Sequence, residues 1–91
     1  MSKTHALKTW PYYFQVSWDG RKDWEIRRND RGFAVGDIVI LEEYDQIKHE
    51  YLGRQIAANV LEVIADAPGL QEGYVILSLE VIAKLEGGRI V

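Results

Sequence analysis

A helical spacing of apolar residues follows the first proline of the chain. Proline loses no needed hydrogen bond at the first position of a helix, so the run Thr9-Trp10-Pro11 marks a helix start. Phe14 and Trp18 then lie four residues apart, which places them on one face. Gly20 supplies the left-handed residue at which helices commonly end. The pattern predicts a helix over residues 11–19, with Phe14 and Trp18 in the core.

The pattern then changes to the period of two that is typical of strands. Over residues 23–28, Trp24 and Ile26 alternate with charged residues, which predicts a strand with one face in water. A turn at Val35-Gly36-Asp37 precedes residues 38–44, whose β-branched side chains predict a second strand.

The second half of the chain contains two longer apolar segments. Residues 54–65 carry apolar side chains at a spacing that fits both a helix and a strand, and we interpret them as a strand. Residues 74–82 are dense in Val, Ile and Leu and predict a final strand. The segments between and after these strands are expected to be a loop over 45–53, a turn over 66–73 and a frayed tail over 86–89. One helix with four or more short strands predicts an α+β fold, in which a small mixed sheet closes into a barrel.

Composition agrees with one domain over residues 1–91. The chain is 47% hydrophobic and contains ten aromatic residues, enough apolar surface for one small core. It has no cysteine, which excludes disulfides and thiolate chemistry and fits a reducing cytoplasm. No apolar run approaches the roughly 20 residues that span a bilayer, and the first residues lack the apolar segment of a signal peptide. We therefore expect a cytoplasmic protein without a membrane partner, either a monomer or a small homo-oligomer.

The net charge is −3, from 11 basic and 14 acidic residues. This sign disfavours binding of duplex DNA or long nucleic acid through bulk electrostatics, and it leaves a short or neutral ligand as the expected partner. The basic residues are unevenly distributed, because five of the eleven fall within residues 21–31: Arg21, Lys22, Arg27, Arg28 and Arg31.

Within this basic segment, Glu25 and Arg27 lie on the same face of the predicted strand, about 7 Å apart along it. If Lys22 folds back over that face, an amine, a carboxylate and a guanidinium converge. Partial burial would favour a neutral amine suited to base or nucleophile chemistry, whereas the carboxylate favours the ammonium. The alternative is a solvated face with weak ion pairs, which is common for such alternation.

The run Gly20-Arg21-Lys22-Asp23-Trp24-Glu25-Ile26-Arg27 resembles the G-x-K-x-x-[E/T]-x-R signature of ASCH domains, which are related to PUA-like RNA-binding barrels. Further segments along most of the chain resemble a family of small ASCH-like domains of phages and bacteria. These segments are His5-Ala6-Leu7-Lys8-Thr9-Trp10-Pro11, Arg27-Arg28-Asn29-Asp30-Arg31, Phe33-Ala34-Val35-Gly36-Asp37, Glu43-Tyr44-Asp45 and Gly73-Tyr74-Val75-Ile76-Leu77.

The resemblance implies a PUA-like barrel with its helix beside a cleft, and it implies one of two functions. Many relatives are inferred RNA binders, while a few very small bacterial ASCH proteins are amidohydrolases that deacylate N4-acetylcytidine. In those enzymes the lysine at the position of Lys22 is essential, and a threonine stands where this chain has Glu25. They also use a glutamate before the last strand, for which Glu72 is the positional candidate, unless it is simply a turn residue.

Because Glu25 replaces that threonine, a different mechanism is expected here. Glu25 would act as general base towards water while protonated Lys22 stabilises the oxyanion. Alternatively, a neutral Lys22 attacks and Glu25 relays the proton. We prefer the water route because the adjacent carboxylate favours a charged Lys22. Arg27 is expected to orient Glu25 or a ligand oxygen.

The remaining candidates are ligand-binding residues. His5 and Lys8 could line the cleft, although a lone histidine near a terminus is more often solvated. Trp10, Tyr44 and Tyr74 could stack on a base, or each could belong to the core. The chain has only two histidines and no phosphate loop or dinucleotide fingerprint, so we expect no metal and no cofactor.

The leading prediction is an amidohydrolase of N4-acylated cytosine nucleosides, with a modified nucleoside or short RNA as its partner. The alternative is a non-catalytic RNA-binding module with Trp10 or a tyrosine on a base and four arginines on phosphates, namely Arg21, Arg27, Arg28 and Arg31. A phage-encoded protein that binds a host partner is a third hypothesis.

Overall fold

The computed structural model describes residues 2–91. Their regular elements are, in chain order, β1 (Thr4–Thr9), α1 (Pro11–Trp18), β2 (Trp24–Arg28), β3 (Ile38–Asp45), β4 (Glu50–Ile64), β5 (Tyr74–Glu86) and β6 (Arg89–Ile90). The strands form one sheet in the order β1-β3-β4-β5-β2, and β6 pairs with β5. Only the β1–β3 pair is parallel. The predicted mostly-β fold with a single helix is therefore confirmed.

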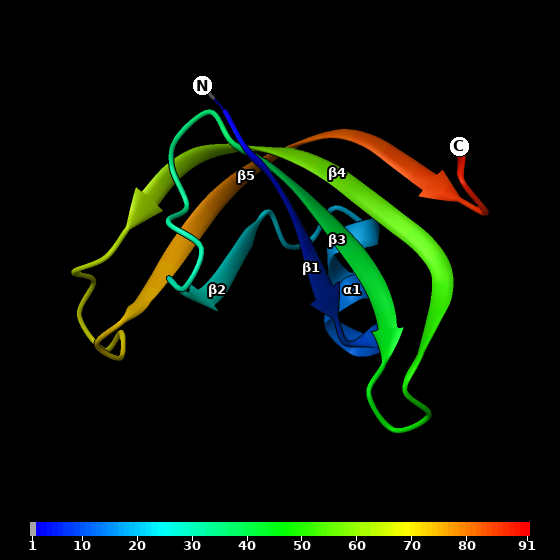
Figure 1. The fold of residues 1–91 in the computed structure, drawn as a ribbon, viewed down its shortest axis with the longest axis horizontal. Helices are drawn as coiled ribbons and strands as arrows, with labels where there is room; N and C mark the ends of the chain where they lie inside the picture. The colour runs from blue at the N-terminus through cyan, green and yellow to red at the C-terminus, as the bar shows by residue number, and fades with distance from the viewer. Residues whose placement is uncertain (1) are drawn as a thin grey trace.

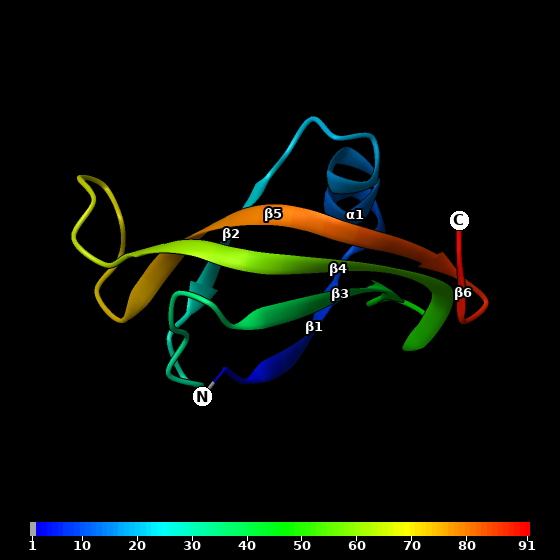
Figure 2. The same cartoon turned by 90° about the horizontal axis from the view of Figure 1, so that it is seen from above.

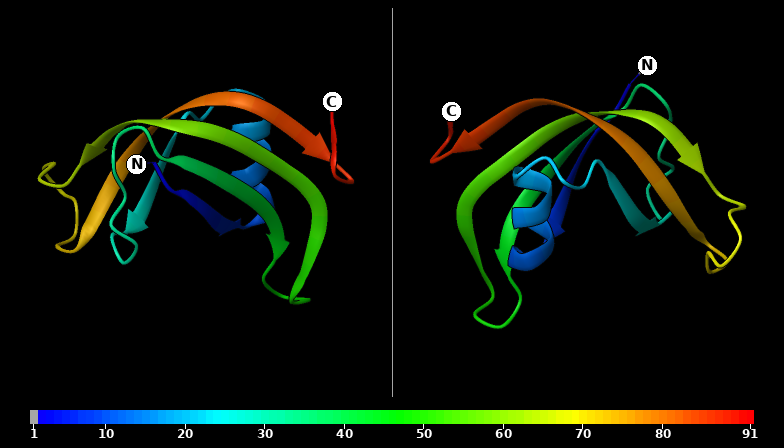
Figure 3. Two further views of the ribbon diagram at one scale, coloured as in Figure 1. Left: turned by 45° about the horizontal axis from the view of Figure 1, so that its top comes forward. Right: turned by 180° about the vertical axis from the view of Figure 1, so that it is seen from behind.

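The sheet curls into an arch rather than a closed barrel (Figure 1). Its two long strands, β4 and β5, run side by side along the molecule (Figure 2). Helix α1 lies on the concave side of the arch, as the view from behind shows (Figure 3). β1 and β2 are the ends of the strand order and do not pair with each other. The predicted small barrel is thus confirmed only in a coarser form, as a curled half-barrel sheet (Figure 1) whose end strands do not pair.

The core fills the concave side of the arch. Its fully buried side chains are Phe14 from α1 and Val39, Leu41, Ile56, Val60 and Leu77 from β3, β4 and β5. Phe14 is buried and Trp18 packs against the core, as their helical spacing predicted. The helix begins at Pro11 and ends before Gly20, which has a φ of +76°.

The structure differs from the prediction in one additional strand and in two segments that were expected to be irregular. β1 was not predicted at all. Most of the expected loop over 45–53 is strand, because β3 extends to Asp45 and β4 begins at Glu50. The tail is paired rather than frayed, since β5 continues to Glu86 and β6 folds back on it. Within residues 2–91, no helix is long and apolar enough to cross a membrane.

Candidate functional site

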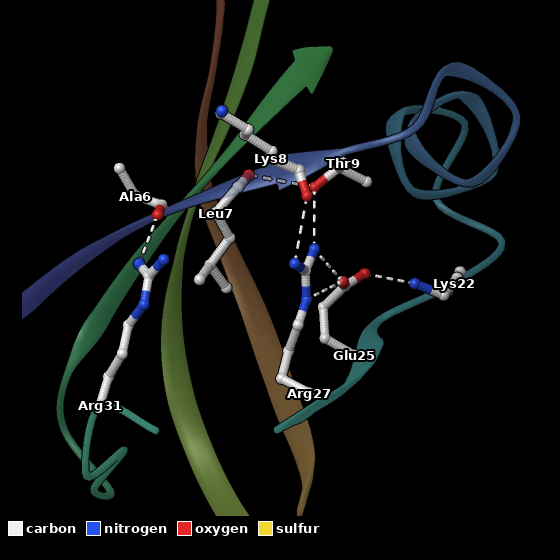
Figure 4. Close-up of polar contacts among 8 residues, drawn as sticks. All are labelled: Ala6, Leu7, Lys8, Thr9, Lys22, Glu25, Arg27 and Arg31. Atoms are coloured by element: carbon white, nitrogen blue, oxygen red, sulfur yellow. Dashed lines mark hydrogen bonds and ion pairs between the residues drawn. The ribbon is translucent and has the colours of Figure 1, made fainter. Parts of the chain in front are cut away.

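Lys22, Glu25 and Arg27 meet at one carboxylate (Figure 4). Lys22 Nζ donates to Glu25 Oε2. Arg27 donates to Oε1 of the same carboxylate through Nε at 3.1 Å and Nη2 at 2.9 Å. The Glu25 residue is only 3% exposed. The predicted convergence of an amine, an acid and a guanidinium is confirmed, and the alternative of a solvated face is excluded for Glu25.

Local sequence produces this convergence in two ways. Gly20 ends α1 in the left-handed conformation, and the chain reverses so that Lys22 precedes β2 by two residues. Within β2, successive side chains point to opposite faces, so Glu25 and Arg27 share the inner face while Trp24 and Ile26 are exposed. The Lys22 ammonium lies 4.8 Å from the centroid of the Trp24 ring, an arrangement that favours a cation.

Arg27 also joins the cluster to the neighbouring strand β1. Its Nη1 donates to the backbone oxygen of Lys8 at 3.1 Å, and its Nη2 donates to Thr9 Oγ1 at 3.2 Å. Thr9 Oγ1 in turn donates to the backbone oxygen of Leu7 at 3.2 Å. Four of the five guanidinium donors are thus directed at protein acceptors, which fixes the orientation of Arg27.

Lys22 has fewer protein acceptors than Arg27. An ammonium carries three N–H donors, and the hydrogen bonds of the described residues assign Lys22 a single acceptor, Glu25. Its side chain is only 11% exposed, so little bulk water reaches the other two donors. With one carboxylate between two cations, the cluster carries a formal charge of +1. Lys22 is therefore the member of the cluster that is equipped to bind an acceptor atom of a ligand.

The cluster forms one wall of an open pocket of about 490 Å³. Three aromatic side chains line the same pocket, namely Trp10, Tyr13 and Trp24. Trp10 is 51% exposed, and its ring lies 6.4 Å from that of Tyr13, so both keep free surface for a flat ligand. The pocket combines aromatic walls with one charged corner, a composition suited to a small heteroaromatic molecule.

The structure separates several predicted ligand-binding residues from this pocket. His5 is buried, with its ring nitrogen Nε2 at 2.8 Å from Asp37, so it neither lines the pocket nor lies in solvent. Lys8 contributes to the pocket, but its ammonium turns away from Glu25 (Figure 4) and lies 4.5 Å from the centroid of the Tyr44 ring. Its backbone oxygen is the group that contacts Arg27.

Tyr44, Tyr74 and Glu72 also lie outside the residues that line the pocket. Tyr44 packs on Tyr51, with ring centroids 5.0 Å apart, and Tyr74 lies under the guanidinium of Arg28. Glu72 is exposed in the turn before β5, beside a separate hollow. The adjacent Gly73 bonds Asn29, which is four residues and about 13 Å along the strand from Glu25. Glu72 is therefore not brought to the cluster.

Sequence reasoning missed Thr9 and Tyr13. Thr9 enters the site from β1, a strand that was not predicted. Tyr13 lies one turn after Trp10, and that spacing alone could have indicated a shared face. No group of three or more His, Cys, Asp or Glu side chains among residues 2–91 is arranged to hold a metal ion.

Comparison with known proteins identifies a family for this small α+β half-barrel. Residues 4–79 match the family described as Domain of unknown function (DUF3850). The chain is also 34% identical over 77 residues to an uncharacterized 12.9 kDa protein of the GpA 3′ region in Escherichia phage P2, covering 85% of this chain and 68% of the phage protein. The chain belongs to the DUF3850 family. The expected likeness to small phage proteins is confirmed in this form, and the closer assignment to ASCH domains stays a prediction.

Proposed function

We propose that this protein is an amidohydrolase that removes the acyl group from N4-acylated cytosine nucleosides such as N4-acetylcytidine. The observation that carries the proposal is the Lys22 ammonium. It is nearly buried, is fixed by Glu25, and has two donors without an acceptor among residues 2–91, beside an aromatic-lined pocket. A donor pair of this kind, in a site with little water, stabilises the negative charge that develops on an acyl oxygen.

The size and walls of the pocket support a nucleoside as the ligand. Small-molecule sites enclose roughly 300–1,000 Å³, and this pocket of about 490 Å³ falls within that range. Aromatic faces bind bases through stacking, which does not require a charged base. The rings of Trp10, Tyr13 and Trp24 supply such faces.

The proposed reaction uses water as the nucleophile. Oε1 of Glu25 accepts two hydrogen bonds from Arg27, whereas Oε2 accepts one from Lys22 and keeps a lone pair. Oε2 takes a proton as the water oxygen attacks the acyl carbon, and the carbonyl electrons move to the oxygen held by Lys22. The carbon–nitrogen bond then breaks, and Glu25 returns the proton to the departing N4 nitrogen. The products are a carboxylic acid and the cytosine amine.

Arg27 serves as a positioning residue in this scheme. Its guanidinium holds Oε1 of Glu25 and two acceptors of β1 at once, so it aims the carboxylate without needing to touch the substrate. The scheme uses neither Glu72 nor His5, because both lie away from the pocket.

The proposal extends to fold family and location. The half-barrel sheet with a helix beside a pocket is compatible with a PUA-like domain of the ASCH type, and the motif of residues 20–27 favours that assignment. The absence of cysteine from the sequence fits a reducing cytoplasm.

The second candidate is a non-catalytic RNA-binding module. Arg21 and Arg28 favour it, because both are exposed and could contact phosphates. However, Arg27 and Arg31 donate to backbone oxygens of β1, so two of the four expected phosphate ligands are already engaged. We therefore favour the enzyme.

The first test is hydrolysis of N4-acetylcytidine by the purified chain, followed through the loss of its absorbance. Replacing Lys22 by alanine should lower turnover by about 100-fold or more, since it removes the oxyanion donor. Arg21→Ala is the matched control, because it removes a neighbouring cation whose side chain is 68% exposed and lies outside the pocket, and it should retain activity. Full turnover by the Lys22 variant would contradict the proposal. Absence of turnover together with salt-dependent binding of short RNA would favour the second candidate.

A further inference from the structure

On the outer edge of β2, the backbone N–H and C=O groups are not paired with another strand. On its inner edge, the Asp23 backbone oxygen accepts a hydrogen bond from Leu79 at 2.8 Å, and the Asn29 amide donates to Gly73 at 2.9 Å. In an antiparallel pair, alternate residues direct both backbone groups at the partner strand. The backbone N–H and C=O groups of residues 23, 25, 27 and 29 therefore point towards β5. Those of residues 24, 26 and 28 point away from it, to the outer edge. β2 is the last strand of the sheet path, so those groups have no strand partner.

Two of these outward-facing residues, Trp24 and Ile26, line the pocket. Ile26 is the central residue of β2 and stands between Glu25 and Arg27, at the level of the charged cluster. Its side chain is exposed, and outside the strand pairing no backbone hydrogen bond among the described residues uses its N–H. On the opposite side of the pocket, β1 also has a free edge, but the backbone oxygen of Lys8 there already accepts a hydrogen bond from Arg27. The free strand edge at the pocket is thus that of β2.

We propose that the backbone N–H of Ile26 reads the hydrogen-bonding edge of the pyrimidine. This inference rests on the proposed function and names its specificity determinant. Cytosine presents two acceptors, ring N3 and O2, beside its N4 position, whereas uracil carries an N–H donor at N3. An N–H group fixed in a strand donates to the N3 acceptor of cytosine. Opposite uracil the same N–H faces the N3–H donor, and both donors stay unpaired. Lys22 meanwhile holds the acyl oxygen, so both groups act on one edge of the same base.

The inference is tested with 3-deazacytidine, which differs from cytidine at ring position 3 alone, and with uridine, which differs at N3 and at the exocyclic group of position 4. Binding of cytidine, 3-deazacytidine and uridine to the unmodified protein is measured by quenching of tryptophan fluorescence, since Trp10 and Trp24 line the pocket. 3-Deazacytidine has a C–H group in place of the N3 acceptor. We expect both analogues to bind about tenfold more weakly than cytidine, the size of effect that follows from an unpaired polar group in a site built for a hydrogen bond. Equal binding of the three, or no binding of cytidine, would overturn the inference.

A backbone variant tests the donor itself. Ile26→Pro removes the N–H, and proline is tolerated at an edge strand where that N–H faces away from the sheet. Ile26→Ala is the matched control, because it removes the side chain and keeps the N–H. The proline variant should bind cytidine and 3-deazacytidine with affinities that agree within about twofold, whereas the alanine variant should keep the tenfold preference. A preference that survives in a folded proline variant would overturn the inference.

The two proposals fail in different ways. If cytidine binds with the expected preference but N4-acetylcytidine is not hydrolysed, the base-reading role of Ile26 stands and the amidohydrolase assignment falls. If N4-acetylcytidine is hydrolysed but the three nucleosides bind equally, the enzyme stands and the role of Ile26 falls.

Discussion

Asp37 joins the beginning of β1 to the turn before β3 through one buried carboxylate. It accepts hydrogen bonds from the His5 ring at 2.8 Å and from the backbone amides of Lys3 and Ala34, each at 3.0 Å. The His5 hydrogen bond first, and the amide of Lys3 second, lower the pKa of Asp37 from 3.8 to about 2. Since β1 and the turn before β3 meet here, the charge of this side chain is coupled to folding.

This pKa shift predicts a loss of stability in acid. A carboxyl group whose pKa is lower in the folded state stabilises the fold fully above its unfolded pKa, and this contribution disappears as the pH falls towards the folded value. The free energy of unfolding should therefore decline between the two values for Asp37, 3.8 and about 2. Urea titrations across this range should show a shallower decline for Asp37→Asn. Asp66→Asn, at an exposed position, serves as the control. An unchanged slope in the Asp37 variant would contradict the prediction.

At the residue scale, sequence predicted the cluster because its members are close in the chain. Lys22, Glu25 and Arg27 span six residues, so a helix stop and a period of two sufficed to bring them together. His5 and Asp37 are separated by 32 positions, and no local pattern indicates that they touch. The burial of Glu25 could not be predicted either, because the Arg27 side chain beside it is held by Lys8 and Thr9 of β1, which are distant in sequence.

At the scale of elements, α1 depends on tertiary packing. It has eight residues and no side-chain hydrogen bond at its first turn, and isolated helices of that length are unstable in water. Phe14 is fully buried and stacks 5.8 Å from Trp18, which anchors the helix on the concave face of the sheet. The rings of Trp10 and Tyr13 reach the pocket from the beginning of this helix.

Truncation of Phe14 should therefore destabilise the whole domain. Phe14→Ala removes a fully buried ring, and such changes cost about 3–5 kcal/mol of unfolding free energy. Tyr12→Ala, on the same helix but 74% exposed, should change stability by less than about 0.5 kcal/mol. Urea unfolding monitored by circular dichroism measures both. Equal effects of the two substitutions would mean that the helix is not held by its buried face.

The strands show which elements local pattern can predict. β2, β3 and β5 carry clear runs or alternation and were found, and β4 was identified although its spacing was ambiguous. β1 was missed because its inward-facing residues are His5, Leu7 and Thr9, of which only leucine is strongly apolar. Their burial is explained by hydrogen bonds to Asp37 and Arg27, which are distant in sequence.

At the scale of the whole molecule, arginine side chains bridge the opening of the half-barrel. Arg27 donates to the backbone oxygen of Lys8 and Arg31 to that of Ala6, so both extend from the β2 side to the free edge of β1. These bonds replace the backbone pairing that a closed barrel would have. Arg27 lies at the pocket, whereas Arg31 is absent from the residues that line it.

This division predicts separable effects of the two bridging arginines on stability and binding. Arg31→Ala should lower the free energy of unfolding by about 1 kcal/mol, since it removes a charge-assisted hydrogen bond from a half-exposed side chain, and should leave nucleoside binding within about twofold of the original protein. Arg27→Ala should weaken both properties, because it also releases the buried carboxylate of Glu25.

The double variant should depart from additivity by more than about 0.5 kcal/mol, because both side chains hold the same edge of β1. Urea unfolding and cytidine titration of the three variants supply the measurements. Strict additivity would mean that the two arginines act on independent parts of the fold, and an equal loss of binding in both single variants would mean that the pocket depends on closure of the entire opening.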